Sequence, residues 1–154
     1  MNREDFPMLN QNYIYLDNGA TTWKPIQVVN EITEYYTKYT ANAHRGDYDI
    51  SLKVDLKYEG ARDIIKDFIN ASNRKEIVFT SGTTNSLNMI ANGFFKNILG
   101  PGDEIIITES EHASNVLPWI RLSEEIGIVV KYIDLDDNYE LTIDNVEKAI
   151  TDKT

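Results

Sequence analysis

The stretch from Ile77 to Phe95 constrains the fold most, because its hydrophobic pattern changes from one period to another within a few residues. Residues 77–80 are apolar or β-branched, which is typical of a buried strand. After a short polar turn, apolar residues recur at steps of three, four and seven, as on one face of a helix. These residues are Leu87, Ile90, Ala91 and Phe94. The stretch therefore predicts a strand, a tight turn and a helix in direct succession.

The turn consists of small and hydroxyl residues, from Ser81 to Thr84. A helix N-terminus presents unpaired backbone N–H groups and the positive end of the helix dipole. Gly82 would let an anion approach the backbone, and Thr83 and Thr84 would add hydroxyl groups, so the turn is suited to a phosphate group. An ordinary strand–turn–helix with a Ser/Thr cap fits the same residues, and the turn alone favours that interpretation.

Strand-like and helix-like segments alternate along the chain. Strands are predicted near 77–80, 104–108 and 128–133, and a shorter one at 13–16. Helices are predicted from Pro25, from Ser51 to about Asn70, after Asn115 and from Thr142. This alternation predicts an α/β fold of three layers with a mostly parallel sheet. Ligands of such sheets bind beyond the carboxyl ends of the strands, so we expect Thr83, Thr84 and His112 to lie close enough to share one small ligand.

The composition excludes several classes of function. The formal net charge is −10, so no basic surface is expected for a nucleic acid or an anionic membrane. There is no cysteine, which excludes disulfides, cysteine-based zinc sites and a thiol nucleophile within these residues. His44 and His112 are the only histidines, so no metal site is expected. No segment has the pattern of a signal peptide or a membrane span, and the chain is predicted to be cytoplasmic.

Four segments together resemble a known family. They read Y-L-D-N-G-A-T-T-W-K-P at 15–25, A-H-R-G at 43–46, S-G-T-T-N-S-L-N at 81–88 and E-H-A-S-N-V-L-P-W at 111–119. In this order and spacing they resemble the N-terminal part of the cysteine desulfurase and selenocysteine lyase family. These are pyridoxal-5′-phosphate (PLP) enzymes of the class V aminotransferase group, with the fold-type I architecture. The resemblance covers nearly the whole chain from Tyr13 onward.

The resemblance implies roles in cofactor binding for three residues. Thr83 and Thr84 correspond to the clamp on the cofactor phosphate, in agreement with the chemistry of the turn. His112 corresponds to the catalytic histidine that stacks on the pyridine ring. At a helix N-terminus a neutral imidazole is favoured over a charged one, and a neutral ring can stack and relay protons. Without the family context, His112 would be interpreted as a capping or surface histidine.

The resemblance also implies a substrate-binding region. Asn18, Gly19 and Ala20 correspond to backbone that lines the substrate pocket, although an Asn-Gly turn explains them equally well. His44 and Arg45 correspond to a segment that faces the substrate. Asp47 and Tyr48 depart from the family's usual residues here, so a solvated loop is the alternative. Trp23 and Trp119 are interpreted as packing residues.

The centre of the chemistry is missing from these residues. A PLP enzyme needs a lysine that forms a Schiff base with the cofactor and a carboxylate on the pyridine nitrogen, and desulfuration needs a thiol. In the family, the lysine follows a histidine in a segment beyond residue 154, and here neither histidine precedes a lysine. We expect residues 1–15 to be an N-terminal segment and residues 16–154 to be the N-terminal part of the PLP-binding large domain. The rest of that domain and a small domain would be absent, as in a truncated piece or an incomplete gene product, and the chain alone would be inactive.

The leading hypothesis is that the parent protein is a homodimer that removes sulfur from L-cysteine, leaving alanine and an enzyme persulfide. An amino-acid substrate and a sulfur-acceptor protein would be its partners. Another class V activity, such as an amino-transferring or kynureninase-like one, is the alternative, and a cysteine in the missing half would discriminate between them. A non-enzymatic fragment that binds a phosphate ligand or a partner is a third possibility. A dinucleotide-binding module is a poor fit, because no G-x-G-x-x-G follows a strand.

Overall fold

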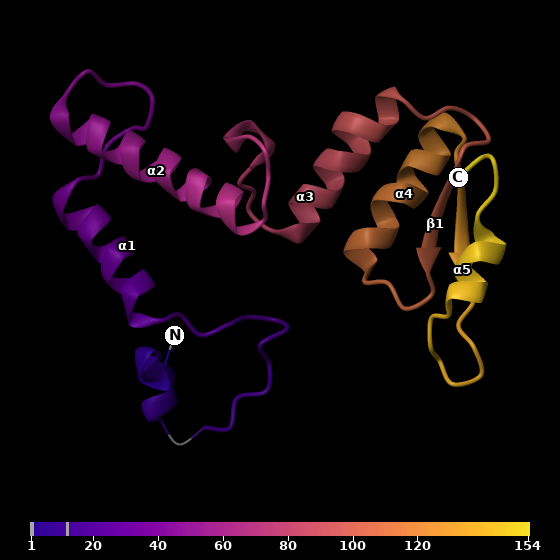
Figure 1. The fold of residues 1–154 in the computed structure, drawn as a ribbon, viewed down its shortest axis with the longest axis horizontal. Coiled ribbons are helices and arrows are strands. Elements are labelled where there is room, and N and C mark those ends of the chain that lie inside the picture. Colours follow the sequence, from indigo (N-terminus) through magenta and orange to yellow (C-terminus); the bar gives the residue numbers. More distant parts are fainter. Residues whose placement is uncertain (1, 12) are drawn as a thin grey trace. The chain divides into compact units, whose positions relative to one another are not determined.

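A computed structural model describes residues 2–11 and 13–154, and its chain divides into two compact units, Met1–Val78 and Phe79–Thr154 (Figure 1). Each unit is described by itself. Met1 and Asn12, which belong to the predicted N-terminal segment 1–15, lie outside the described residues.

The first unit is mostly helical. Its elements are η1 (Arg3–Asp5), η2 (Pro7–Asn10), α1 (Ile26–Lys38), α2 (Asp49–Phe68) and η3 (Arg74–Glu76). The helix predicted from Pro25 is confirmed, since Pro25 is the residue before α1 and its extended backbone starts the first turn. The strand predicted at 13–16 is wrong, because residues 13–17 form no ladder in the described chain. The ring of Tyr15 instead stacks on Trp23, with the ring centroids 4.5 Å apart.

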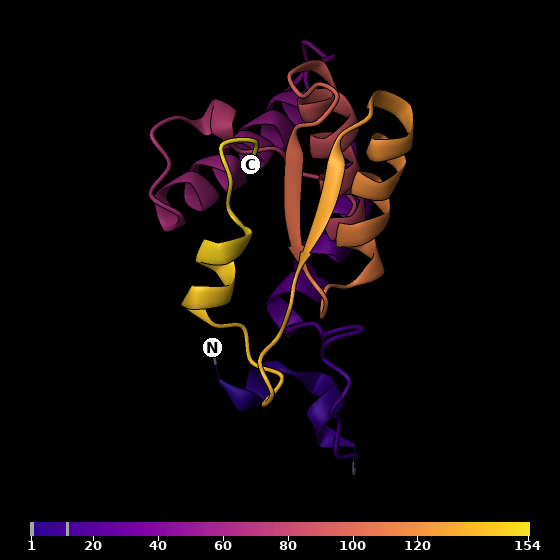
Figure 2. The same cartoon turned by 90° about the vertical axis from the view of Figure 1, so that its right-hand side faces the viewer.

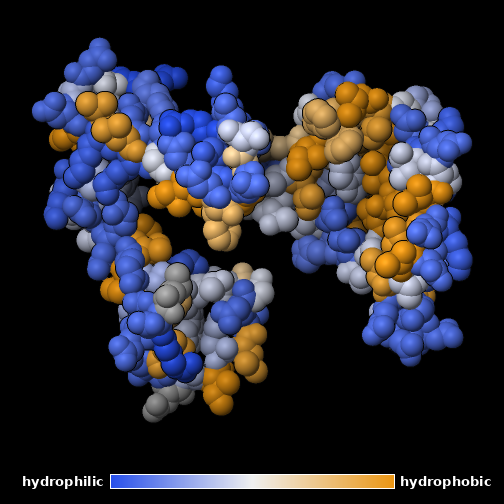
Figure 3. All heavy atoms as spheres, viewed as in Figure 1, coloured by the Kyte–Doolittle hydropathy of each residue, from blue (hydrophilic) through white to orange (hydrophobic). Residues whose placement is uncertain are grey.

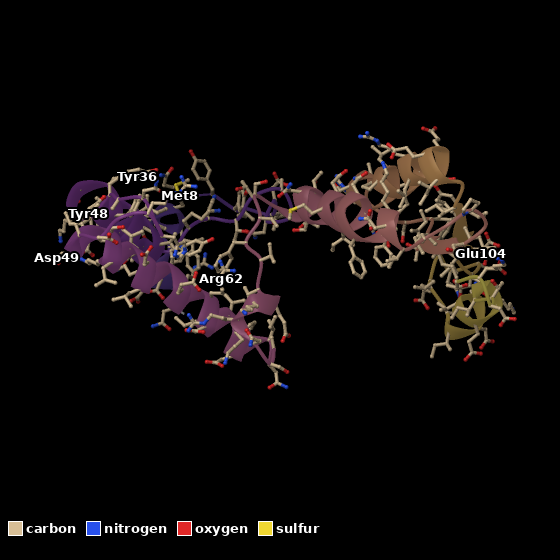
Figure 4. The ribbon with its side chains drawn as sticks, turned by 90° about the horizontal axis from the view of Figure 1, so that it is seen from above. Met8, Tyr36, Tyr48, Asp49, Arg62 and Glu104 are labelled. Carbon is tan, nitrogen blue, oxygen red and sulfur yellow. The ribbon has the colours of Figure 1, made fainter. Side chains whose placement is uncertain are left out.

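Side chains connect the two long helices of this unit. Tyr39, which is only 3% exposed, follows α1, and its hydroxyl donates a hydrogen bond to Glu31. Lys57 on α2 donates to the same carboxylate at 2.5 Å. These two hydrogen bonds, that of Lys57 first, lower the pKa of Glu31. Further along α2, the guanidinium of Arg62 donates to the carbonyl of Ile77 (Figure 4).

The second unit contains a small parallel sheet. It begins with α3 (Thr83–Met89), which continues through the π turn η4 (Ile90–Phe94) and the 3-10 turn η5 (Phe95–Asn97). There follow β1 (Glu104–Thr108), α4 (Ala113–Ile126), β2 (Val129–Ile133) and α5 (Ile143–Ala149). The strands pair in parallel, with Glu104 opposite Val129 and Thr108 opposite Ile133. Helices α4 and α5 lie on opposite sides of the two strands (Figure 2), so the α/β class and the parallel pairing are confirmed.

The strand predicted at 77–80 is wrong. Ile77 has an extended backbone, with φ −96° and ψ 116°, but no strand pairs with residues 77–80 in the described chain. A strand exists only through its ladder of hydrogen bonds to a neighbour. Here the carbonyl of Ile77 accepts a hydrogen bond from Arg62, while Val78 and Phe79 are exposed. The apolar run therefore links the two units instead of joining the sheet.

The core of the second unit lies between α4, the strands and the helical segment that starts with α3. Its buried residues are Ala91, Ile107, Trp119, Leu122 and Ile128. Leu122 is fully buried. Trp119 is 7% exposed, and its indole N–H donates to Asn115 Oδ1 at 3.2 Å. The interpretation of Trp119 as a packing residue is confirmed.

Much apolar surface of this unit remains uncovered. Figure 3 shows an orange band over the region of the strands. Large exposed side chains of the unit include Val129, Tyr132, Leu141 and Ile143. β1 and β2 are the only strands of their sheet within the described residues, so each has an unpaired edge. Exposed apolar faces and open strand edges are typical of surfaces that further protein covers.

One ion pair across the sheet predicts how stability depends on pH. Lys131 on β2 donates to Glu104 Oε2 at 2.8 Å, and Thr151 donates to the same oxygen at 2.6 Å (Figure 4). These hydrogen bonds, that of Lys131 first, hold the pKa of Glu104 below its ordinary 4.5. Because the folded pKa is lowered, the stabilisation is present above pH 4.5 and is lost as the pH falls through the folded value.

We therefore expect Glu104→Gln to lower the urea midpoint of the second unit near neutral pH and to have little effect well below pH 4.5. Circular dichroism at both pH values measures this, and Glu124→Gln, at an exposed position of α4, is the matched control. An equal loss at both pH values would contradict the assignment.

Candidate functional site

His112 caps helix α4. It is the residue before Ala113, and its Nδ1 accepts the backbone N–H of Ser114 at 3.1 Å. A ring nitrogen that accepts an N–H carries no proton, so the neutral imidazole of His112 has its proton on Nε2. His112 therefore caps α4, as the alternative interpretation from sequence predicted. The capping hydrogen bond uses Nδ1 and leaves the faces of the exposed ring open.

The loop before His112 is hydrogen-bonded to the end of β1. Glu111 accepts from the hydroxyl of Thr108 at 3.3 Å with one carboxylate oxygen and from the side-chain amide of Asn115 at 3.0 Å with the other. Thr108 is the last residue of β1 and Asn115 lies in the first turn of α4. Glu111 thus holds the strand end and the helix start together, with His112 between them.

Ser114 links His112 to the turn at the start of α3. Its Oγ lies 2.8 Å from His112 Nδ1 and 3.0 Å from Thr84 Oγ1. Helices α3 and α4 pack against each other, which places residues thirty positions apart in contact. The structure therefore brings Thr84 and His112 together, and Thr83 is the neighbour of Thr84 in the first turn of the same helix.

The start of α3 is open. Gly82 has φ 153°, which strains any residue with a side chain, and an added Cβ would meet no atom within 4 Å. In the described part of the chain no side chain caps α3, and Thr83 and Thr84 are exposed. The first N–H groups of a helix have no acceptor within it. The turn can therefore donate several hydrogen bonds to an anion.

A groove of about 340 Å³ lies between α3 and α4 and begins at the Thr84–Ser114 contact. Its lining comprises Thr84, Asn88, Ala113, Ser114, Leu117, Pro118 and Arg121. This volume is at the lower end of the range of small-molecule sites. The described residues hold no group of three or more His, Asp or Glu side chains arranged to bind a metal ion.

The other predicted site residues belong to the first unit. Asn18, Gly19 and Ala20 form an exposed turn, whose ends are held by the hydroxyl of Tyr15 through hydrogen bonds to the carbonyls of Asp17 and Thr21.

His44 and Arg45 lie in the loop before α2, and both are exposed. His44 has a left-handed backbone with φ 60°. Its ring nitrogens lie 3.6 Å from an oxygen of Asp55 and 3.5 Å from an oxygen of Glu59, both on α2. His44 thus contacts carboxylates of its own unit.

Ser114 was not among the site residues predicted from sequence. The available signal was its position two residues after His112 at a helix start, since a cap side chain accepts from the second or third helical N–H. The hydroxyl contact with Thr84 has no signal in the sequence.

The parallel sheet, the hydroxyl turn and the imidazole at the helix start define an α/β protein with an open helix start lined by hydroxyl groups. The chain belongs to the aminotransferase class-V family, whose model matches residues 14–154. A curated relative from Halalkalibacterium halodurans, named "Probable cysteine desulfurase", is 41% identical over 154 residues, which cover 97% of this chain and 38% of the relative. This chain thus spans less than two-fifths of that relative.

Two solved structures are similar to this chain, the first in sequence and fold and the second in fold. The apo structure of a cysteine desulfurase from Thermococcus onnurineus NA1 is 44% identical, with a TM-score of 0.87 over 95% of this chain and 36% of that chain. A C-DES mutant with glycine covalently linked to its PLP cofactor shares the fold, with a TM-score of 0.78 at 20% identity. Within the described residues, no helix is both long and apolar enough to cross a membrane.

Proposed function

We propose that residues 16–154 form the N-terminal part of the PLP-binding large domain of a cysteine desulfurase, and that the whole parent protein removes sulfur from L-cysteine to give alanine and an enzyme persulfide. The observation that carries this proposal is the contact chain from Thr84 through Ser114 to His112, in a chain 41% identical to a probable cysteine desulfurase. The uncovered apolar surface and open strand edges support a larger parent. The parent would be a homodimer.

The residues of the turn suit the cofactor's phosphate. Thr83 offers a hydroxyl, and the backbone N–H groups of Thr83 and Thr84 point out of the helix start, where the dipole favours an anion. The positive φ of Gly82 keeps the approach free of a side chain. His112 offers an exposed ring face a short distance away, through Ser114.

PLP, when bound, supplies the electron sink that stabilises negative charge on the α-carbon of an amino acid. The residues of this chain would bind the phosphate at Thr83 and Thr84, support the ring with His112, and hold a proton at His112 Nε2. Asn18, Gly19, Ala20, His44 and Arg45 are proposed to line the substrate side. A sulfur-acceptor protein would take the persulfide sulfur from the parent's thiol, which lies outside these residues because they contain no cysteine.

The isolated chain is expected to be inactive with PLP and L-cysteine, because it contains neither a thiol nor the family's lysine. The test joins this chain to the remainder of the Halalkalibacterium halodurans relative, in place of the segment that it matches. With dithiothreitol present to reduce the enzyme persulfide, we expect this hybrid to release sulfide and alanine in equal amounts, with no product from the chain alone. The unaltered relative is the positive control.

Three outcomes would contradict the proposal. Turnover by the isolated chain would mean that a complete site lies within these residues. A folded hybrid that fails to bind PLP would mean that the turn and His112 do not form the cofactor site. A hybrid that binds PLP but transfers amino groups without releasing sulfide would favour another class V activity.

A further inference from the structure

The hydrogen bonds around Ser114 have a fixed direction. The backbone N–H of Ser114 can only donate, so His112 Nδ1 is the acceptor and carries no proton. The hydroxyl of Ser114, 2.8 Å from the same nitrogen, must then donate its single proton to it. Ser114 Oγ is left as an acceptor, so the contact of 3.0 Å is a donation from the hydroxyl of Thr84. The chain therefore runs from Thr84 to Ser114 to His112.

Because the hydroxyl of Thr84 donates to Ser114, only some of the polar groups of Thr84 remain for a ligand. Its hydroxyl proton is directed to Ser114, and its carbonyl accepts the side-chain amide of Asn88 at 2.8 Å. Its backbone N–H, in the first turn of α3, remains available to an anion. Thr83, whose hydroxyl is not in this chain of contacts, is the residue that can offer a hydroxyl to the same anion.

We propose that Ser114 is a positioning residue, which holds the imidazole of His112 as the Nε2–H tautomer and couples its orientation to the turn at Thr84. The inference rests on the proposed function, in which the turn and the ring bind two ends of one cofactor. Two donors on Nδ1, one from the backbone and one from the hydroxyl, fix the ring plane better than the backbone donor alone. Ser114 is half-buried, whereas His112 and Thr84 are exposed, so the link is partly protected from water at its centre.

The test uses the 154-residue chain labelled with ¹⁵N-histidine. The chain has two histidines, so a His44→Gln background leaves only the signals of His112. We expect the long-range ¹H–¹⁵N spectrum to show a single Nε2–H tautomer. Ser114→Ala keeps the backbone N–H that caps α4 and removes the shorter of the two contacts to Nδ1, so the Nε2–H tautomer should lose part of its preference and a minor Nδ1–H population should appear in the spectrum. Ser114→Thr should restore the single tautomer, and Thr84→Val should shift the Nδ1 signal while Thr84→Ser should not.

A second readout follows binding of pyridoxine 5′-phosphate, which has the ring and phosphate of the cofactor but cannot form a Schiff base with lysines. We expect Ser114→Ala to weaken this binding about fivefold, the size expected for one lost hydrogen bond, and Ser114→Thr to restore it. Unphosphorylated pyridoxine is the control for the phosphate contact.

The outcomes separate the two proposals. If the unaltered chain binds the probe and Ser114→Ala changes neither the tautomer nor the binding, the role of Ser114 is overturned while the proposed function stands. If the unaltered chain does not bind the probe better than pyridoxine, the proposed phosphate site fails, and the positioning role toward the cofactor fails with it. A tautomer mixture in Ser114→Ala, weaker binding and rescue by Ser114→Thr together support the inference.

Discussion

Replacing Leu122 by alanine is expected to lower the free energy of unfolding of the second unit by about 2–5 kcal/mol. Leu122 is fully buried among the core side chains contributed by α4, the strands and the segment after α3. Removing three carbon atoms there loses their transfer free energy and leaves a cavity that the close-packed surroundings fill only in part. A loss of this size is a large fraction of the stability of a typical domain, so Leu122→Ala should leave the second unit partly unfolded.

Urea titration followed by tryptophan fluorescence measures this change. The chain has two tryptophans, one in each unit, so a Trp23→Phe background makes Trp119 the reporter of the second unit. Leu117→Ala is the matched control, because Leu117 lies on the same helix and is 61% exposed. It should change the free energy by no more than about 0.5 kcal/mol. Equal losses in the two variants would mean that the core is not where the structure places it.

Replacing His112 by alanine in the hybrid enzyme is expected to reduce sulfide release by about 100-fold or more, the lower end of the range for a lost acid–base group. The same change removes a helix cap, which is expected to cost about 1 kcal/mol of stability. Because His112 both caps α4 and presents its ring, a single variant does not separate the two effects.

Two further variants separate them. Asparagine is among the preferred capping residues, so His112→Asn should restore the stability of α4 while sulfide release stays low. His112→Phe restores a ring face without a cap or a proton, so it should recover PLP affinity but neither stability nor full turnover. Thermal unfolding, PLP absorbance and sulfide release give the three readouts. Sulfide release restored by His112→Asn would show that the histidine acts only as a cap.

The helices could be predicted from sequence because their signals are local. Pro25 before α1, Thr142 as the cap of α5 and Gly127 after α4 act through their own backbone and the next few residues. The strands at 104–108 and 128–133 could also be predicted, since each is an apolar run bounded by turn residues.

The run at 77–80 has the same local signal as these strands but a different outcome. Its residues are as apolar and β-branched as those of β1, yet the structure pairs them with no strand in the described chain. Pairing depends on a neighbour, which the residues of the run do not encode. The guanidinium of Arg62, on the helix that precedes the run, donates a hydrogen bond to the carbonyl of Ile77 instead.

The sequence by itself determined the family, through four motifs in order, and with it the candidate residues Thr83, Thr84 and His112. It also determined the starts of α1 and α5, because a proline or a cap acts on residues two or three positions apart. α2 begins at Asp49 and not at Ser51, and α4 begins at Ala113 and not after Asn115. Only the tertiary structure decided that Ser114 connects Thr84 to His112, and that His44 lies against the carboxylates of Asp55 and Glu59. The physical reason is that a hydrogen bond between residues thirty positions apart requires two helices to pack at a distance and register that no local pattern specifies.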